Sequence, residues 1–354
     1  MTNCKLFNSD CLDSLKKIES ETVDLIFADP PYNLQLKNNL SRPDTSKVDA
    51  VNDYWDQFNS FEDYDRFTEE WLKECKRVLS KNGSIWVIGS YHNIFRVGKS
   101  IQDLGFWILN DVIWNKKNPM PNFKGTRLTN AHETLIWATK SEKSKYTFNY
   151  HSMKTLNDDK QLRSDWNLAI CNGSERLLTS KNKKLHSTQK PEALLYRVLN
   201  CASKKGDVIL DPFMGSGTTG AVAKKLGRNF LGIERDKRYF KAAERRISKV
   251  SEIDDHCNVP MVNKKTEKRI PFGYLVESGL VEPGLNLFDH KKKYKAKVMA
   301  DGSINCNKIQ GSIHKVGAEI QGMPSCNGWS YWHFNIEGKL EPIDNLRKKI
   351  RSSL

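Results

Sequence analysis

The sequence predicts an α/β protein with a doubly wound, mostly parallel sheet, followed by a small C-terminal α+β domain. Short apolar runs, many of them β-branched, recur along the first 250 residues at the length of buried strands. Segments with apolar residues at helical spacing lie between several of these runs. Strands that alternate with helices favour a parallel sheet covered by helices on both faces.

The length favours two domains. At 354 residues and 40.7 kDa the chain exceeds what one compact core usually holds. Residues 251–268 are polar and lack clear periodicity, which is typical of a linker. We therefore place a domain boundary near residue 260, with a first domain over residues 1–258 and a second over residues 259–354.

Individual elements can be assigned from the pattern. The predicted strands are Val23–Ala28, Ser84–Gly89, Asp111–Trp114, Thr134–Thr139, Asp207–Asp211 and Asn229–Ile233. The clearest helices are Phe61–Leu79, from its near-3.6 apolar spacing, and Pro191–Ala202, which starts with a proline. Ligands of doubly wound sheets bind beyond the carboxyl ends of the strands, so chemistry is expected just after each apolar run.

Composition favours a cytosolic protein with a polyanionic partner. No apolar run approaches the ~18 residues of a membrane span, and the N-terminus lacks a signal-peptide pattern. The eight cysteines are scattered, which disfavours both a disulfide framework and a clustered zinc site. The net charge of +15 favours a nucleic-acid partner, although basic chains can also simply be soluble.

Two predicted strands end in residues typical of a ligand site. After Val23–Ala28 comes Asp29-Pro30-Pro31-Tyr32, where the prolines end the strand and hold an acid and an aromatic ring in a rigid turn. After the strand at 207–210, Gly215 and Gly217 allow the backbone to approach a ligand closely. Glu234 ends the next strand, where a carboxylate can accept hydrogen bonds from ribose hydroxyls.

Each motif alone has a structural alternative. A single Gly-x-Gly is more often a plain strand-to-helix turn, and Asp-Pro-Pro-Tyr is also compatible with a rigid surface turn. The glycine loop lacks the third glycine of the dinucleotide pattern, yet an acid follows the next strand. This combination suits a nucleoside cofactor without a pyrophosphate, such as S-adenosylmethionine.

Three motifs, residues 29–32, residues 186–192 (His-Ser-Thr-Gln-Lys-Pro-Glu) and residues 211–218, occur in the order typical of one enzyme family. The chain resembles the permuted, or beta, group of DNA amino-methyltransferases, in which the catalytic motif precedes the cofactor loop. The resemblance implies a Rossmann-like, S-adenosylmethionine-dependent methyltransferase domain over residues 1–258. It also implies target-recognition elements inserted at about 115–185.

The resemblance assigns roles to particular residues. Asp29, Pro30, Pro31 and Tyr32 correspond to the catalytic motif. The residues expected at the cofactor are Asp10, Cys11, Asp29, His186, Ser187, Thr188, Lys190, Asp211, Phe213, Gly215, Ser216, Gly217, Thr218 and Glu234. For the loop that carries His186 and Lys190, the alternative is a solvated segment ahead of a helix. No metal is required by this chemistry.

The catalytic motif suits transfer to an exocyclic amine. The lone pair of adenine N6 is delocalised into the ring, and bonds from its N–H groups to Asp29 and to the Pro30 carbonyl localise that pair. Tyr32 would stack on a base that has been flipped out of the duplex. In the family an acid at the first motif position accompanies adenine N6 and Ser accompanies cytosine N4. Asp29 therefore favours adenine, with cytosine-N4 transfer as the alternative.

Four C-terminal segments, Ile270–Val276, Ala300–Ile304, Gly311–Ala318 and Cys326–His333, carry a second resemblance. They resemble the small domain appended to cell-cycle-regulated adenine methyltransferases that read GANTC. This implies a DNA-recognition domain over residues 259–354. Independently, the alternation in Tyr294–Val298 and the Asp-Gly at 301–302 predict a hairpin.

Basic, amide and aromatic residues in predicted loops are candidate DNA contacts. They are Lys124, Arg127, Lys315, Asn327, Trp329 and Arg347. Core packing is the alternative for Trp329, and ordinary solvation is the alternative for the loop residues. The polar segment Leu34–Gln57 is expected to act as a lid that orders on DNA.

The sequence therefore predicts an adenine-N6 methyltransferase that uses S-adenosylmethionine, acts on double-stranded DNA and works in the cytoplasm at the nucleoid. GANTC is the expected site, and its two-fold symmetry favours a homodimer. No obligatory protein partner is expected. The alternatives are another recognition sequence, or a basic DNA-binding protein with an inactive site, which the intact motifs disfavour.

Overall fold

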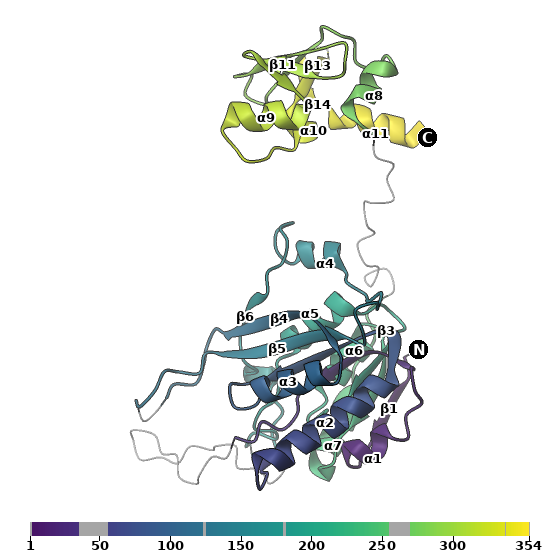
Figure 1. Ribbon diagram of the computed structural model, residues 1–354, viewed down its shortest axis with the longest axis vertical. Coiled ribbons are helices and arrows are strands. Elements are labelled where there is room, and N and C mark those ends of the chain that lie inside the picture. The colour runs from purple at the N-terminus through teal and green to yellow at the C-terminus, as the bar shows by residue number, and fades with distance from the viewer. Residues whose placement is uncertain are drawn as a thin grey trace. The chain divides into compact units, whose positions relative to one another are not determined.

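The computed structural model describes residues 2–34, 56–122, 125–179, 182–254, 270–336 and 338–353. The chain divides into two compact units, Met1–Val262 and Asn263–Leu354 (Figure 1). Each unit has its own hydrophobic core. Most of the predicted lid (35–55) and most of the predicted linker (255–268) lie outside the described residues. Within the described ranges, no helix is both long and apolar enough to cross a membrane.

The first unit is built on an eight-stranded sheet with the order β1-β8-β7-β2-β3-β5-β4-β6. Its strands are β1 (Cys4–Phe7), β2 (Val23–Ala28), β3 (Leu79–Gly89), β4 (Trp107–Lys116), β5 (His132–Thr139), β6 (Asp165–Leu168), β7 (Val208–Asp211) and β8 (Asn229–Ile233). All neighbouring strands pair in parallel except β5, which runs antiparallel to β3 and β4. The predicted mostly parallel α/β fold is confirmed.

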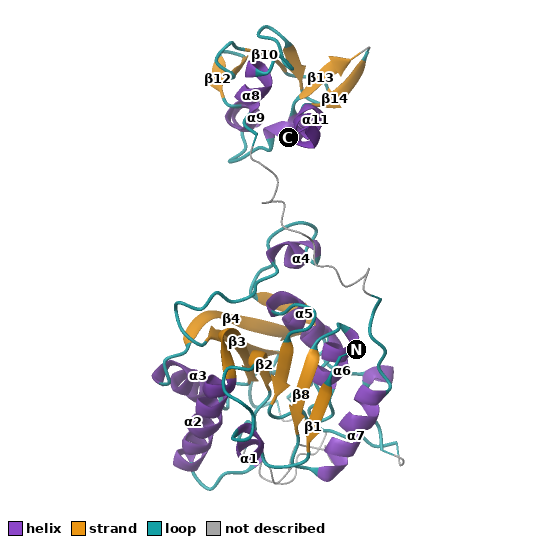
Figure 2. Ribbon diagram, turned by 90° about the vertical axis from the view of Figure 1, so that its right-hand side faces the viewer, coloured by secondary structure: helices purple, strands orange, loops and turns teal. Residues whose placement is uncertain are grey.

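Helices cover both faces of this sheet (Figure 2). They are α1 (Cys11–Leu15), α2 (Phe61–Val78), α3 (Ile94–Asp103), α4 (Tyr150–Thr155), α5 (Glu192–Ala202), α6 (Thr218–Lys225) and α7 (Lys237–Ser248). Helices α1 to α3 pack in one hydrophobic cluster and α4 to α7 in the other. Strand β2 supplies both clusters, with Leu25 and Phe27 in one and Ile26 and Ala28 in the other, because alternate side chains point to opposite faces.

Helix α2 shows how the sequence sets an element. The Ser60 hydroxyl accepts a hydrogen bond from the Asp63 backbone N–H at 3.1 Å, which caps the first turn. Trp71, Leu72 and Cys75 are fully buried on the face toward the sheet. The same helix carries Tyr64, whose hydroxyl donates to the Pro31 carbonyl at 2.9 Å, so the helix also holds the turn after β2.

Some elements differ from the sequence prediction. Strands β1 and β6 have four residues each and were not predicted, because each mixes polar with apolar residues, whereas the equally short β7 is mostly a continuous apolar run. Strand β3 begins at Leu79 rather than at Ser84, with a register shift against β2 in its polar first half. The predicted strand Thr134–Thr139 is present as β5, so the region 115–185, with β5 and β6, contributes two strands to the sheet as well as loops.

The second unit has a six-stranded antiparallel sheet with the order β12-β11-β10-β9-β13-β14. Its strands are β9 (Asn286–Phe288), β10 (Lys295–Val298), β11 (Ile304–Cys306), β12 (Ile309–Gly311), β13 (His333–Ile336) and β14 (Lys339–Pro342), and its helices are α8 (Phe272–Glu277), α9 (Ile313–Gln321), α10 (Gly328–Tyr331) and α11 (Asp344–Ser353). The predicted hairpin is confirmed by the pairing of Val298 with Ile304. Trp332 is fully buried, and its indole N–H donates to the Ile313 carbonyl at 2.9 Å.

Candidate active site

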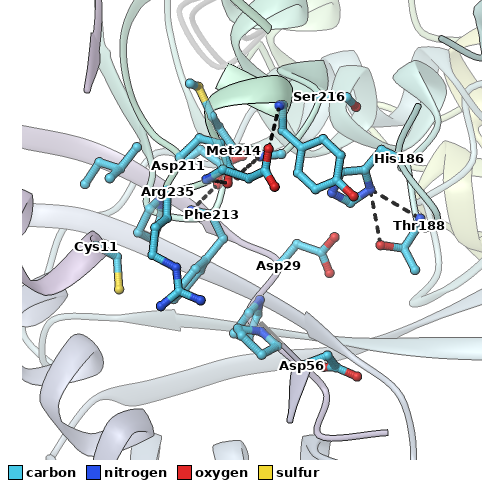
Figure 3. Close-up of a pocket in the computed structure, with 18 of the residues that line it drawn as sticks. Cys11, Asp29, Asp56, His186, Thr188, Asp211, Phe213, Met214, Ser216 and Arg235 are labelled. Carbon is cyan, nitrogen blue, oxygen red and sulfur yellow. Dashed lines mark hydrogen bonds between the residues drawn. The ribbon is translucent and has the colours of Figure 1, made fainter. Parts of the chain in front are cut away.

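A cavity of about 520 Å³ lies beyond the carboxyl ends of β1, β2, β7 and β8. Most of the predicted catalytic and cofactor residues line it: Asp10, Cys11, Asp29, Pro30, Pro31, Tyr32, His186, Thr188, Lys190, Asp211, Phe213, Gly215, Ser216, Thr218 and Glu234. Figure 3 shows Asp29 near the middle of these side chains. Ser187 and Gly217 are not among the lining residues. Segments from the start, middle and end of the first unit therefore meet at one site.

The turn after β2 is held rigidly from two sides. The Asp56 carboxylate accepts hydrogen bonds from the backbone N–H groups of Tyr32, Asn33 and Leu34, at 2.5, 2.9 and 3.0 Å. Tyr64 bonds the Pro31 carbonyl, as described above. Burial raises the pKa of Asp56, although the three backbone N–H groups oppose that shift. The side chains of Asp29 and Tyr32 are thus presented on a fixed backbone.

Asp29 and Lys190 form a buried ion pair in the cavity. The Lys190 ammonium lies 2.6 Å from Asp29 Oδ2, and their side chains are 8% and 18% exposed. Burial raises the pKa of Asp29, and the nearby ammonium opposes this rise. The same ammonium lies 5.2 Å from the centre of the Tyr32 ring, within the range of a cation–π contact.

The Asp211 carboxylate holds the loop after β7 through two hydrogen bonds. One Asp211 oxygen accepts from the Phe213 backbone N–H at 3.0 Å, and the other accepts from the Thr219 hydroxyl at 2.6 Å. Burial raises the pKa of Asp211 to about 7. Gly215 and Gly217 have φ of +50° and +75°, a conformation that favours glycine. The predicted close backbone approach therefore has a structural basis in this loop.

Two acidic residues, Glu234 and Asp10, also line the cavity. Glu234 accepts from the backbone N–H groups of Gly215 and Asp236, at 3.0 and 2.7 Å. Burial raises the pKa of Glu234. Asp10 caps α1 by accepting from the Leu12 backbone N–H at 2.9 Å, and it lies 3.7 Å from the Arg235 guanidinium. Each carboxylate retains lone pairs that can accept hydrogen bonds from a ligand.

His186 packs beside this loop as a neutral imidazole. Burial and the Lys190 charge lower the pKa of His186 to about 4. Its Nδ1 accepts from the Thr188 backbone N–H at 3.2 Å, and its ring lies 4.4 Å from the Tyr239 ring. A Cβ at Gly215 would come within 3.0 Å of His186 Nε2, so the glycine allows this packing.

Sequence reasoning missed several residues of the site. Asp56, Arg235 and Tyr239 line the cavity, and Glu133 bonds the Tyr32 hydroxyl at 3.1 Å through its Oε2. Glu133 is the second residue of β5, and it precedes the apolar run of that strand, whereas the predicted site residues follow theirs. Because β5 runs antiparallel, its first residues lie at the same sheet edge as the carboxyl ends of β2 and β3. An acid ahead of the Thr134–Thr139 run was the signal available.

Candidate DNA contacts outside the cavity lie in varied surroundings. Arg127 is exposed and its guanidinium lies 5.7 Å from the Tyr91 ring centre. Lys124 lies outside the described residues. In the second unit, Lys315 is exposed on α9, 3.8 Å from Glu319. Asn327 caps α10, where its side chain accepts from the Trp329 backbone N–H at 3.2 Å.

Trp329 belongs to the core of the second unit. Its side chain is buried at 6% exposure, the Phe272 ring packs against it edge-on, and the Arg347 guanidinium lies 4.3 Å from the ring centre. Arg347 also pairs with Asp344. The structure thus favours the core-packing alternative for Trp329 over stacking on a base.

Comparison with known proteins follows the same division of the chain. A DNA methylase model matches residues 23–245. The chain belongs to the DNA methylase family. A second model, Restriction Enzyme Adenine Methylase Associated, matches residues 256–354 of this DNA methylase.

Curated relatives extend the match over nearly the whole chain. The methylase is 48% identical over 342 residues to the Type II methyltransferase M.HinfI of Haemophilus influenzae, covering 97% of this chain and 95% of that protein. It is 43% identical over 248 residues to the Type II methyltransferase M2.DpnII of Streptococcus pneumoniae, covering 70% and 90%.

Solved structures share the fold of the first unit. A complex of M1.HpyAVI with SAM superposes with a TM-score of 0.50 at 29% identity, covering 69% of this chain and 98% of that one. The cytosine-N4-specific PvuII DNA methyltransferase gives a TM-score of 0.54 at 19% identity, covering 75% and 90%, which shows a shared fold only.

Proposed function

We propose that this DNA methylase transfers the methyl group of S-adenosylmethionine to N6 of a flipped adenine in double-stranded DNA. One observation carries the proposal: Asp29, in its Asp-Pro-Pro-Tyr turn, shares a cavity with Gly215 and Ser216 of the loop after β7 and with Glu234. A catalytic acid and a nucleoside-type loop therefore face one space. Family membership and the methyltransferase relatives support the same reaction.

The lining residues suit S-adenosylmethionine. Glu234 and Asp10 offer carboxylate oxygens for hydroxyl and amine groups, and Phe213 and Cys11 offer apolar surface for an adenine ring. Gly215 has no Cβ, so the loop can pack closely against His186, which a Cβ at this position would contact. We assign the end that carries His186, Thr188 and Lys190 to the methionine part. The bound cofactor supplies an electrophilic methyl on a sulfonium.

The chain's own groups prepare the nucleophile. Asp29 accepts an N–H bond from the adenine amine, which localises the nitrogen lone pair toward the methyl group. Lys190 opposes the rise of the Asp29 pKa, and this favours the ionised acceptor. Tyr32 provides the ring on which the flipped base stacks, and the bond to Glu133 fixes the orientation of that ring.

Recognition is assigned to the loops of the 115–185 region and to the second unit. We propose GANTC as the target, because the C-terminal segments resemble those of the cell-cycle-regulated family. We also propose, from the order of its motifs, that the chain is a member of the permuted group. Lys124, Arg127, Lys315, Asn327 and Arg347 contact DNA in this proposal. A homodimer on the two-fold-symmetric site, acting at the nucleoid in the cytoplasm, completes it.

Substitution of Asp29 tests the catalytic assignment. Asp29→Ala removes the acceptor of the amine, so methyl transfer to duplex DNA should fall at least about 100-fold. Binding of S-adenosylmethionine by calorimetry should change much less. Asp103→Ala, at an exposed carboxylate at the end of α3, is the control and should retain full transfer. Full turnover by a folded Asp29→Ala protein would remove Asp29 from the mechanism.

A further inference from the structure

A cluster of four charged side chains lies beside the cavity, and the charges of two of them, Glu133 and Lys116, have no role in the reaction described above. The charged cluster consists of Asp29, Lys190, Glu133 and Lys116. Besides the pair between Asp29 and Lys190, the Lys190 ammonium lies 3.8 Å from Glu133 Oε2, and the Lys116 ammonium lies 2.7 Å from Glu133 Oε1. Side-chain exposures of Glu133 and Lys116 are 12% and 13%.

The sheet topology brings these residues together. Lys116 is the last residue of β4, Glu133 is the second residue of β5, and Asp29 follows β2. Since β4 and β2 point the same way and β5 runs opposite to its neighbours, all three positions lie at one sheet edge. Lys190 reaches this edge from the segment before α5.

The cluster is electrically balanced, with two carboxylates and two ammonium groups. Burial alone would raise the pKa of Glu133, but Lys190 and Lys116 outweigh it and lower that pKa. Burial likewise opposes the charge on Lys190, but Asp29 and Glu133 outweigh it and raise the pKa of Lys190. Buried ion pairs rarely add much net stability over apolar residues, so this balance calls for a functional reason.

We infer that Glu133, balanced by Lys116, is the residue that lets this site favour a cationic sulfonium over the neutral thioether that transfer leaves behind. The inference rests on the proposed function and deepens it. Lys190 stands beside Asp29 at the end of the cavity assigned to the methionine part, where its positive charge would repel a sulfonium. Asp29 pairs with Lys190 directly, and Glu133 is the second carboxylate that keeps the whole cluster neutral. Glu133 contacts Lys190 and Tyr32 but does not line the cavity.

The effect is specific to the charge on sulfur. S-adenosylmethionine and S-adenosylhomocysteine share their adenosine and amino-acid parts, so contacts to those parts cancel in the ratio of the two dissociation constants. One uncompensated positive charge in the cluster weakens only the sulfonium ligand. At an effective dielectric constant of about 20, a unit charge about 12 Å away changes the ratio about tenfold, and a closer charge changes it more.

Glu133→Gln isolates this charge. The amide keeps the shape and an oxygen that can accept from the Tyr32 hydroxyl, while the cluster becomes net positive. Calorimetry with both ligands should show the ratio of the S-adenosylmethionine to the S-adenosylhomocysteine dissociation constant rise about tenfold. Lys116→Met leaves the cluster net negative and should lower that ratio. The double variant restores balance and should return the ratio to within about threefold of the wild-type value.

The outcomes separate this inference from the proposed function. A role in folding alone would weaken both ligands together and leave the ratio unchanged in all three variants, which would overturn the inference. Should Glu133→Gln fail to fold, an unchanged ratio in Lys116→Met would overturn it equally, and a lowered ratio would support it. Wild-type protein that binds neither ligand would overturn the proposed function, and this inference with it.

Discussion

Lys190 connects the catalytic acid to the rest of the site. It pairs with Asp29, faces Tyr32 and Glu133, and accepts from the Thr218 hydroxyl through its backbone carbonyl at 3.2 Å. Its position therefore couples the turn after β2 to the first turn of α6. We expect substitutions of Lys190 to disturb both catalysis and cofactor binding, unlike substitutions of Asp29.

The neutral state of His186 predicts a pH dependence of stability. In the unfolded chain an ordinary His takes up a proton near pH 6.5, whereas in the folded chain the pKa is lowered to about 4. Below pH 6.5 the unfolded state binds more protons, so the unfolding free energy falls as pH drops. The contribution is at most about 1.4 kcal/mol per pH unit.

Urea unfolding of wild type and His186→Asn, each at about pH 7 and about pH 5, measures this contribution. Asp211 acts in the opposite direction in this range, because its pKa is raised to about 7, and it is present in both proteins. The loss of stability between the two pH values should therefore be smaller in His186→Asn. Equal losses in both proteins would contradict a neutral buried His186.

Strand ends and the loops after them position the chemistry. The loop between β7 and α6 depends on Gly217, which has φ of +75° and whose added Cβ would lie 2.8 Å from Ala243 Cβ. Helix α7 thereby packs directly against the cofactor loop. The glycine meets two requirements, one for backbone conformation and one for space.

Gly217→Ala should lower the unfolding free energy by about 2–4 kcal/mol, from conformational strain together with overpacking. Gly206→Ala is the matched control, since Gly206 also has positive φ, +86°, but has open space around its Cβ position. That variant should lose only about 1–2 kcal/mol. Chemical denaturation compares the two, and equal losses would mean that packing against α7 does not constrain the loop.

Much of the site could be predicted because its strands are parallel. Asp29, Asp211 and Glu234 follow apolar runs, and parallel strands place such residues at one edge. Glu133 could not be found this way, because it precedes the apolar run of β5. Lys116 ends β4, and its partner Glu133 lies beside it only because β5 runs antiparallel to β4. Trp329 illustrates a second limit: an aromatic residue in a small domain looks the same in sequence whether it packs in a core or on a base.

The two units have separate cores and separate matches to known families. The first unit contains the whole cavity, and the second has exposed Lys315 and an antiparallel sheet with its own buried tryptophans. The net charge of +15 extends over the whole chain. This division predicts that cofactor binding and DNA recognition can be separated.

A chain that ends at Val262 should bind S-adenosylmethionine within about threefold of the full-length value but lose at least about tenfold in DNA affinity or site selectivity. Binding of the full chain should weaken steeply with salt, because Lys and Arg displace counterions from phosphates. Thermal unfolding checks that the shortened chain is folded. Unchanged selectivity would remove the recognition role of the second unit, and a flat salt response would contradict phosphate contacts.

The reaction itself is tested by transfer of labelled methyl groups from S-adenosylmethionine to mixed-sequence duplex DNA, followed by nucleoside analysis and mapping of the modified positions. We predict N6-methyladenine confined to one short motif, GANTC. N4-methylcytosine would contradict the assignment of the base while leaving the fold intact. Absence of label from a protein that binds both DNA and cofactor would contradict the proposed activity and favour an inactive DNA-binding protein.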